Sequence, residues 1–382
     1  MLSWKGKSLT IGHLTAKLPI IQGGMGIGIS LNGLASAVAN AGGIGVISAA
    51  GVGMLEDDFS KNFVEANLRA LRDEIQRARE KTKGILGVNI MVAMSNFADM
   101  VKTSIDEKID IIFAGAGLPL NLPSFLTEDC HTRLVPIVSS ARAAGLIAKR
   151  WFDKYKYTPD AFVVEGPMAG GHLGFSEEQL TNPDYSLEKL VVEVVNEVKK
   201  IEEKSGKQIP VIAGGGIYSG EDIYRITQMG AAGVQMATRF VTTVECDASD
   251  DFKNTYINCT ERDIGIIKSP VGMPGRAIVN DFILDVKEGK KKPYKCPYHC
   301  IITCNVESSP YCIVLALINA KLGKLKHGFA FAGANAYRAE KIVPVQELVD
   351  SLTEEYNEAA LKANSFRPEC QVETLSPPSR EN

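Results

Sequence analysis

The sequence has neither a strong excess of one charge nor a long uninterrupted hydrophobic run. Its 42 basic residues are balanced by 45 acidic residues, so neither a nucleic acid nor an anionic membrane is expected as a partner. The opening residues MLSWKGKSLTIGHLTAK have no continuous apolar stretch after their charges, which argues against a secretory signal. Residues 18–55 lack charge, but Pro19 and repeated glycines divide them into pieces too short to span a membrane. We therefore expect a cytoplasmic protein with a small-molecule ligand.

Cysteine is scarce until late in the chain. Only one of the eight cysteines precedes residue 246, whereas Cys296, Cys300, Cys304 and Cys312 are close together. Because cytoplasmic thiols stay reduced, such a group indicates metal ligands or redox groups. If the stretch is helical, the first three share one face, and Cys312 returns after a turn at Pro310. The four thiolates could bind a four-iron cluster or a structural zinc, or no metal; the absence of paired C-x-x-C motifs favours the cluster.

Eight short runs of apolar and β-branched residues occur in the first part of the chain, and longer amphipathic segments lie between them. The amphipathic segments at residues 57–82 and 186–205 have apolar positions at helical spacing. The expected strands are residues 19–24, 43–48, 85–91, 109–116, 133–140, 161–166, 209–215 and 233–240. Eight strands alternating with helices predict an α/β protein with a TIM (β/α)8 barrel.

The alternation stops after residue 240, which suggests a division of the chain. We expect a ligand-binding barrel over residues 1–245. Residues 246–369 would form an appended segment that contains the four-cysteine cluster and ends in a helix. Residues 370–382 are polar and contain proline, as is typical of a loose tail.

Two neighbouring loops of the expected barrel suggest a phosphate site. AGGGIYSGED, residues 213–222, has three glycines followed by Ser219 as a candidate helix N-cap. MATRF, residues 236–240, would add backbone amides and a hydroxyl on the neighbouring strand. One such loop is more often a tight turn, but two adjacent loops favour phosphate binding. No complete G-x-G-x-x-G is present, so the signal for a dinucleotide fold is weak.

His172 is the candidate acid–base residue. It lies in EGPMAGGHLGF, residues 165–175, just beyond two glycines at the end of an expected strand. A lone histidine is usually structural, but glycines allow close approach of a flat ligand ring. From the residues alone, a catalytic and a structural role are equally supported.

Four motifs occur together: PIIQGGMGIGIS, GVNIM, EGPMAGGHLGF and PVIAGGGIYSGEDI with GAAGVQMATRF. Over residues 10–280 the chain thereby resembles the nitronate monooxygenases (2-nitropropane dioxygenases) and the FMN-dependent enoyl-acyl-carrier-protein reductases II. The resemblance implies FMN in the barrel mouth, with His172 as a base or a substrate-orienting group. The implied cofactor contacts are Gln22, Gly24, Met25, Asn89 and Glu165 for the flavin ring and ribityl chain, and Gly171, Gly215, Gly216, Gln235 and Thr238 for the phosphate.

The expected function is FMN-dependent reduction of an activated carbon–carbon double bond, such as an enoyl group carried as an acyl thioester. Nitronate oxidation is the alternative, and a non-catalytic flavin-binding subunit with structural zinc is a second one. NAD(P)H or a ferredoxin-like protein would supply electrons, and the lysine-rich residues 287–295 could dock the latter. A solvated loop is the more usual role for such lysines. A homodimer is also expected.

Overall fold

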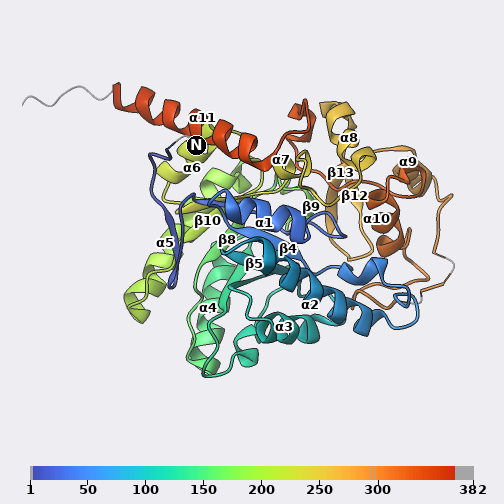
Figure 1. Cartoon of the computed structure of the whole chain (residues 1–382), viewed down its shortest axis with the longest axis horizontal. Helices are drawn as coiled ribbons and strands as arrows, with labels where there is room; N and C mark the ends of the chain where they lie inside the picture. Colours follow the sequence, from blue (N-terminus) through green and yellow to red (C-terminus); the bar gives the residue numbers. More distant parts are fainter. Residues whose placement is uncertain (1–2, 294, 297, 366–382) are drawn as a thin grey trace, which may run out of the picture.

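The computed structural model describes residues 3–293, 295–296 and 298–365 (Figure 1). The expected polar tail, residues 370–382, lies outside the described residues. Among the described helices, none is long and apolar enough to cross a membrane.

Eight parallel strands form one sheet that closes into a barrel. Their order is β3, β11, β10, β8, β7, β6, β5, β4, and the two edge strands meet through a parallel bridge between Ile21 and Ile44. The strands are β3 Ile20–Gln22, β4 Gly45–Ser48, β5 Leu86–Met91, β6 Ile111–Gly115, β7 Arg133–Val138, β8 Phe162–Glu165, β10 Val211–Gly214 and β11 Gly233–Met236. Each falls within one of the eight predicted runs, so the predicted barrel fold is confirmed.

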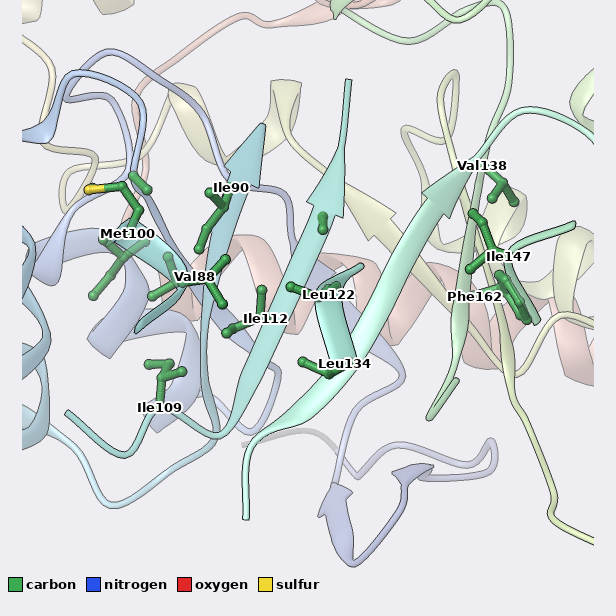
Figure 2. Packing of buried hydrophobic residues seen from close by; sticks show 14 of the residues in the cluster. Val88, Ile90, Met100, Ile109, Ile112, Leu122, Leu134, Val138, Ile147 and Phe162 are labelled. Carbon is green, nitrogen blue, oxygen red and sulfur yellow. The ribbon is translucent and has the colours of Figure 1, made fainter. Parts of the chain in front are cut away.

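Helices surround this sheet because their apolar faces pack on the outward-facing strand residues. The helices are α1 Asn32–Asn40, α2 Phe63–Lys81, α3 Phe97–Asp106, α4 Ala141–Tyr155, α5 Leu187–Ser205, α6 Gly220–Gln228 and α7 Thr238–Val241. Figure 2 shows part of this layer, including Val88 and Ile90 of β5, Met100 of α3 and Ile147 of α4. The predicted helix at 57–82 begins later, at Phe63, because residues 57–62 form turns.

Two local devices support the barrel. Ser219 caps α6 by accepting a hydrogen bond from the Asp222 amide, and the Asp222 carboxylate accepts one in return from the Ser219 amide. This confirms the predicted N-cap. A hairpin of β1 (Leu9–Ile11) and β2 (Leu14–Ala16) packs its buried residues against the barrel interior.

The chain after residue 245 contributes to the barrel mouth. Its elements are α8 Asp250–Asn258, β12 Ile264–Lys268, β13 Pro274–Ile278, α9 Asp281–Lys287, α10 Ile313–Lys321 and α11 Val345–Ser365. Strand β13 pairs with β12 and also with β9 (Gly171–His172), which belongs to the barrel loop after β8. Short 3-10 turns lie at Val52–Leu55, Leu122–Phe125, Pro183–Tyr185, Glu261–Asp263, Leu325–His327 and Ala336–Arg338. The division into 1–245 and 246–369 stays a prediction.

The last described helix contacts the N-terminal segment of the chain. Figure 1 shows α11 lying along α6. The Trp4 ring stacks on Tyr356 of α11 with 4.0 Å between ring centroids. Asn357 also accepts a hydrogen bond from the Lys5 amide and donates one to the Ser3 carbonyl. The N-terminal segment is therefore fastened to the C-terminal helix.

Candidate active site

A cavity opens at the carboxyl ends of the barrel strands, where the active sites of this fold are found. Residues that follow or end β3, β5, β8 and β11 line it, and Cys300, Ile301 and residues of α10 form another part of its wall. Eight of the predicted catalytic and cofactor-binding residues line this cavity: Gly24, Met25, Asn89, Glu165, Gly171, His172, Gln235 and Thr238. The structure therefore brings together strand-end residues that are far apart in the sequence.

Gln22, Gly215 and Gly216 are not among the residues that line the cavity. The Gln22 side chain is fully buried, and its amide exchanges hydrogen bonds with the Val46 backbone. It thereby joins β3 to β4 at the seam where the barrel closes. Its predicted contact with the flavin would have to replace these bonds.

Gly215 and Gly216 follow β10 with positive φ angles of 96° and 89°. A Cβ atom at Gly215 would lie 2.9 Å from the Gly166 carbonyl oxygen, and one at Gly216 would lie 3.0 Å from the Met168 Cβ. Both glycines are needed for backbone conformation and for close packing. The Gly216 carbonyl accepts a hydrogen bond of 2.6 Å from Asn335, which fixes this loop against the C-terminal segment.

Glu165 ends β8 and faces the cavity. Burial raises the pKa of its carboxyl to about 7. Within the described part of the chain, this carboxyl makes no hydrogen bond to a protein group. An acidic side chain in such surroundings is suited to hydrogen bonding with a polar group of a bound ligand.

His172 is held by a strand that the C-terminal segment completes. The His172 backbone pairs with Gly275 in the antiparallel ladder between β9 and β13. Nε2 lies 2.6 Å from the Ser269 hydroxyl, and the ring meets the Phe331 ring edge-on at 5.0 Å. Burial lowers the pKa of His172 to about 4, so the imidazole is neutral near pH 7.

Arg276 holds the loop that carries His172. It lies on β13 and donates hydrogen bonds to the carbonyls of Pro167 and Ala169, the latter at 2.8 Å. Analysis of the sequence missed Ser269 and Arg276, because both lie about a hundred residues beyond the loop they contact. Their proximity in SPVGMPGRAI, after the last barrel strand, was the available signal.

The cysteine stretch covers one side of the cavity. Its described residues form no helix, so the conditional expectation of one helical face is wrong. Instead, Ile301 pairs with Met94 in an antiparallel bridge, and the carbonyl of Cys300 accepts a hydrogen bond from the Ser95 amide. These backbone bonds to the loop after β5 set the course of the stretch in place of helical bonds. Cys300 is buried and lines the cavity.

The four thiols are near enough to influence one another. Burial chiefly, and then the charges of Cys312, Cys296 and Cys304, raise the pKa of Cys300 to about 12. Cys296 accepts a hydrogen bond from the His299 amide, and Cys312 precedes the first residue of α10. Over residues 3–293, 295–296 and 298–365, however, no three ligating side chains are placed to hold one metal ion.

The lysine-rich stretch is partly neutralised by its own neighbours. Lys290 forms ion pairs with Asp285 and Glu288, and Lys291 pairs with Asp285. These pairs are largely exposed and contribute little to stability. They reduce the positive charge that the stretch presents to a partner.

Comparison with known proteins identifies the family. Residues 7–355 match the family model described as nitronate monooxygenase. The chain belongs to this family. A probable nitronate monooxygenase from Staphylococcus aureus (strain Newman) is 29% identical over 314 residues, which cover 75% of this chain and 81% of that protein.

Two solved structures are also similar to this chain. FabK from Thermotoga maritima is 28% identical with a TM-score of 0.71, and the match covers 92% of this chain and 96% of FabK. A nitroalkane oxidase from Streptomyces ansochromogenes matches in fold, at 22% identity and a TM-score of 0.68, over 91% of this chain and 98% of its own. The predicted resemblance is confirmed, and this nitronate monooxygenase family member is an FMN-dependent oxidoreductase.

The cavity fits a flavin in chemical character. Glycines such as Gly24 and Gly171 line it, and their lack of side chains allows a flat ring to approach the backbone. The side chains of Asn89, Glu165 and Gln235 make no hydrogen bonds to the described protein groups, and so are available to the polar edge of a ligand. The family's cofactor is therefore compatible with the residues present.

Proposed function

We propose that this nitronate monooxygenase family enzyme reduces an activated carbon–carbon double bond in an uncharged acyl substrate. The observation that carries this proposal is the character of the cavity wall. Among the described residues that line the cavity, none is lysine or arginine. The stretch after Cys300 and helix α10 contribute a continuous apolar side formed by Ile301, Ile313, Val314 and Leu317.

The absence of lysine and arginine from the described cavity wall distinguishes between the two candidate substrates. A nitronate is an anion, and removing it from water is costly unless a positive group compensates its charge. Glu165 is the acidic side chain of the wall, and His172 is neutral there, so neither group compensates a negative charge. An enoyl thioester is neutral at its reacting end and carries an apolar chain, which matches the wall.

FMN, when bound, supplies the two-electron chemistry. We propose that Asn89, Glu165 and Gln235 bind its polar groups, while Gly216 and Thr238 lie toward its phosphate. Support for the phosphate side comes from the link between the two loops: Asn335 binds the Gly216 carbonyl, and the Gly333 amide donates to the Thr238 hydroxyl at 3.3 Å. Glu165, with its raised pKa, can retain a proton and donate a hydrogen bond.

His172 would orient the substrate. A pKa of about 4 makes its imidazole a weak base, poorly suited to removing a proton from a carbon acid. A neutral imidazole can still accept a hydrogen bond from the substrate and exclude water from the cavity. Orientation of this kind can account for about 100-fold in rate when it is lost.

Nitronate oxidation is the second candidate, favoured by the family description and by the Staphylococcus aureus relative. A direct comparison separates the two. Enzyme with reduced FMN would be mixed anaerobically with a crotonyl thioester, which accepts two electrons and so reoxidises the flavin. Enzyme with oxidised FMN would be mixed anaerobically with ethyl nitronate, which donates electrons and so reduces the flavin. We expect flavin absorbance to report fast reoxidation by the thioester and slow reduction by the nitronate. A nitronate-dependent reaction with no thioester turnover would contradict the proposal.

We further propose that Cys296, Cys300, Cys304 and Cys312 bind one four-iron cluster. Zinc bonds of about 2.3 Å would bring four sulfurs to roughly 3.8 Å of one another, and the described thiols are not arranged for a single ion. A four-iron cluster binds each thiolate at a different iron and so holds the sulfurs farther apart. Mutual proximity and the hydrogen bond from the His299 amide to Cys296 support this choice.

Metal analysis tests the cluster without reference to turnover. Protein purified without oxygen should contain iron and acid-labile sulfide, with broad absorption beyond the flavin bands. Cys300→Ser should lose that absorption, whereas Cys130→Ser, outside the cluster, should keep it. One equivalent of zinc without iron or sulfide would contradict the cluster. The electron donor, NAD(P)H or a ferredoxin-like protein, and a homodimeric assembly are also proposals.

A further inference from the structure

Phe331 is the aromatic neighbour of His172 in the cavity. It lines the cavity together with Ala332 and Gly333, in the segment between α10 and α11. Its ring meets the His172 ring edge-on, with 5.0 Å between the ring centroids. Nε2 of the same imidazole lies 2.6 Å from the Ser269 hydroxyl. Phe331 therefore occupies space directly beside the candidate catalytic ring.

The backbone of Phe331 is fixed by two contacts. It forms an antiparallel bridge with Ala277 of β13. Its carbonyl oxygen accepts a hydrogen bond from the hydroxyl of Tyr256, a buried residue of α8. Neither contact involves the Phe331 side chain. A substitution at this position therefore changes the ring and leaves both backbone contacts available.

The ring of Phe331 is confined by its other neighbours. It packs edge-on against the Phe329 ring, with 4.9 Å between centroids. Phe329 is fully buried, and its ring packs in turn against Phe282 at 6.1 Å and Tyr311 at 5.5 Å. On the side of β13, a Cβ atom at Gly275 would lie 2.8 Å from Cε1 of Phe331. Because these neighbours are closely packed, the Phe331 ring has no room to withdraw from a bulky ligand group in the cavity.

We propose that Phe331 is a specificity-determining residue that excludes substrates with a bulky group at the reacting double bond. The inference deepens the proposed function and rests on it for the contact between His172 and the reacting end of the substrate. A crotonyl chain carries only a methyl group at its double bond. A cinnamoyl chain carries a phenyl group, which would need the space that the Phe331 ring occupies. The wall beside His172 therefore selects the narrower of the two substrates.

The first test compares these two substrates with the FMN-loaded enzyme. We expect Phe331→Ala to raise the ratio of kcat/KM for a cinnamoyl thioester to that for a crotonyl thioester by about tenfold or more. A general loss of activity from a less firmly held His172 affects both substrates and cancels in the ratio. Phe97→Ala removes a ring of the same size from α3, away from the cavity lining, and should keep the wild-type ratio. An unchanged ratio in Phe331→Ala would overturn the proposal.

Gly275→Ala tests the same contact from the opposite side. Apart from the Phe331 ring, the nearest atoms to the added methyl group lie at an ordinary 3.4 Å or more. The methyl group should therefore push the Phe331 ring into the cavity and lower kcat/KM for the crotonyl thioester by about tenfold. In a Phe331→Ala background the same substitution meets no ring and should have little effect. Equal losses in the two backgrounds would contradict the assigned contact.

A pair of nitronates separates this inference from the proposed reaction. If the enzyme oxidises nitronates and does not reduce thioesters, the proposed reaction is rejected, but the space beside His172 is the same. Ethyl nitronate and the nitronate of phenylnitromethane then replace the two thioesters. Phe331→Ala should still raise the ratio of kcat/KM for the wider substrate to that for the narrower one. A ratio that stays unchanged with the pair that turns over would overturn the role of Phe331.

Discussion

The barrel wall and the stretch that covers its mouth obtain their structure in different ways. In the wall, a repeating pattern sets the neighbours: Gly45 of β4 lies against the helix that precedes it, where a Cβ atom would be 1.8 Å from the Ala35 carbonyl oxygen. Over the mouth, single contacts between distant residues determine the path. The Thr303 hydroxyl donates to the Val271 carbonyl at 2.8 Å, and the Ile302 amide donates to Ala93 at 2.9 Å. The wall is therefore determined by a repeating local pattern, and the mouth by contacts between residues that are distant in the sequence.

The strongest test of the wall is Gly45→Ala. The added methyl group would collide with backbone atoms, so we expect the free energy of unfolding to fall by about 3 kcal/mol, measured by chemical denaturation. Gly214→Ala is the matched control, because its Cβ atom would meet neighbours at an ordinary 3.4 Å or more. Equal losses in the two variants would contradict this account of the wall.

The next effect concerns flavin retention. Gly215→Ala combined with Gly216→Ala should displace the loop after β10 and weaken FMN binding by roughly tenfold or more, measured as flavin absorbance per chain on dilution. Gly206→Ala is the control. It imposes a similar left-handed backbone strain, at φ 68°, but nothing lies within 4 Å of its new methyl group. If the double variant holds FMN as the control does, the assignment of the phosphate side is incorrect.

His172→Ala should lower turnover of an enoyl thioester by about 100-fold while FMN stays bound. The reason is that the ring orients the substrate without belonging to the predicted flavin contacts. His327→Ala, at an exposed position, is the control and should retain full activity. Steady-state rates at saturating thioester would measure the effect, and unchanged rates would return His172 to a structural role.

The smallest expected effect is the pH dependence that Glu165 gives to stability. The pKa of the Glu165 carboxyl rises from 4.5 to about 7 on folding. The contribution of this carboxyl to the free energy of unfolding is therefore complete below pH 4.5 and is lost as pH rises through 7. In flavin-free protein, the free energy of unfolding of Glu165→Gln relative to that of wild type should rise by on the order of 1–2 kcal/mol between pH 5 and pH 8. The exposed Glu178→Gln should show no such trend, and a flat difference for Glu165→Gln would show that this carboxyl is not neutral near pH 6.

The sequence predicted the wall well because its information is local. Ser219 could be recognised as a cap from its own neighbours, and all eight strands coincide with β-branched runs. The resemblance implies a flavin contact for Gln22, but no local pattern in the sequence indicates that its amide also bonds to Val46 at the barrel seam. Ser269 and Arg276 could not be assigned, because their partners lie across the mouth at large sequence separation. The four-residue spacing of the cysteines suggested a helix, but the path of the stretch is set by backbone pairing with Met94.

The stacking of Trp4 on Tyr356 of α11 has a consequence for folding during synthesis. A chain emerging from the ribosome completes all eight strands by residue 236, more than a hundred residues before α11 appears. Until then, the apolar surface of α6 that α11 covers, including the site against Leu352 and Tyr356, stays open to water. The nascent barrel must therefore pass through a stage with an uncovered hydrophobic flank, which chaperones recognise and which favours self-association.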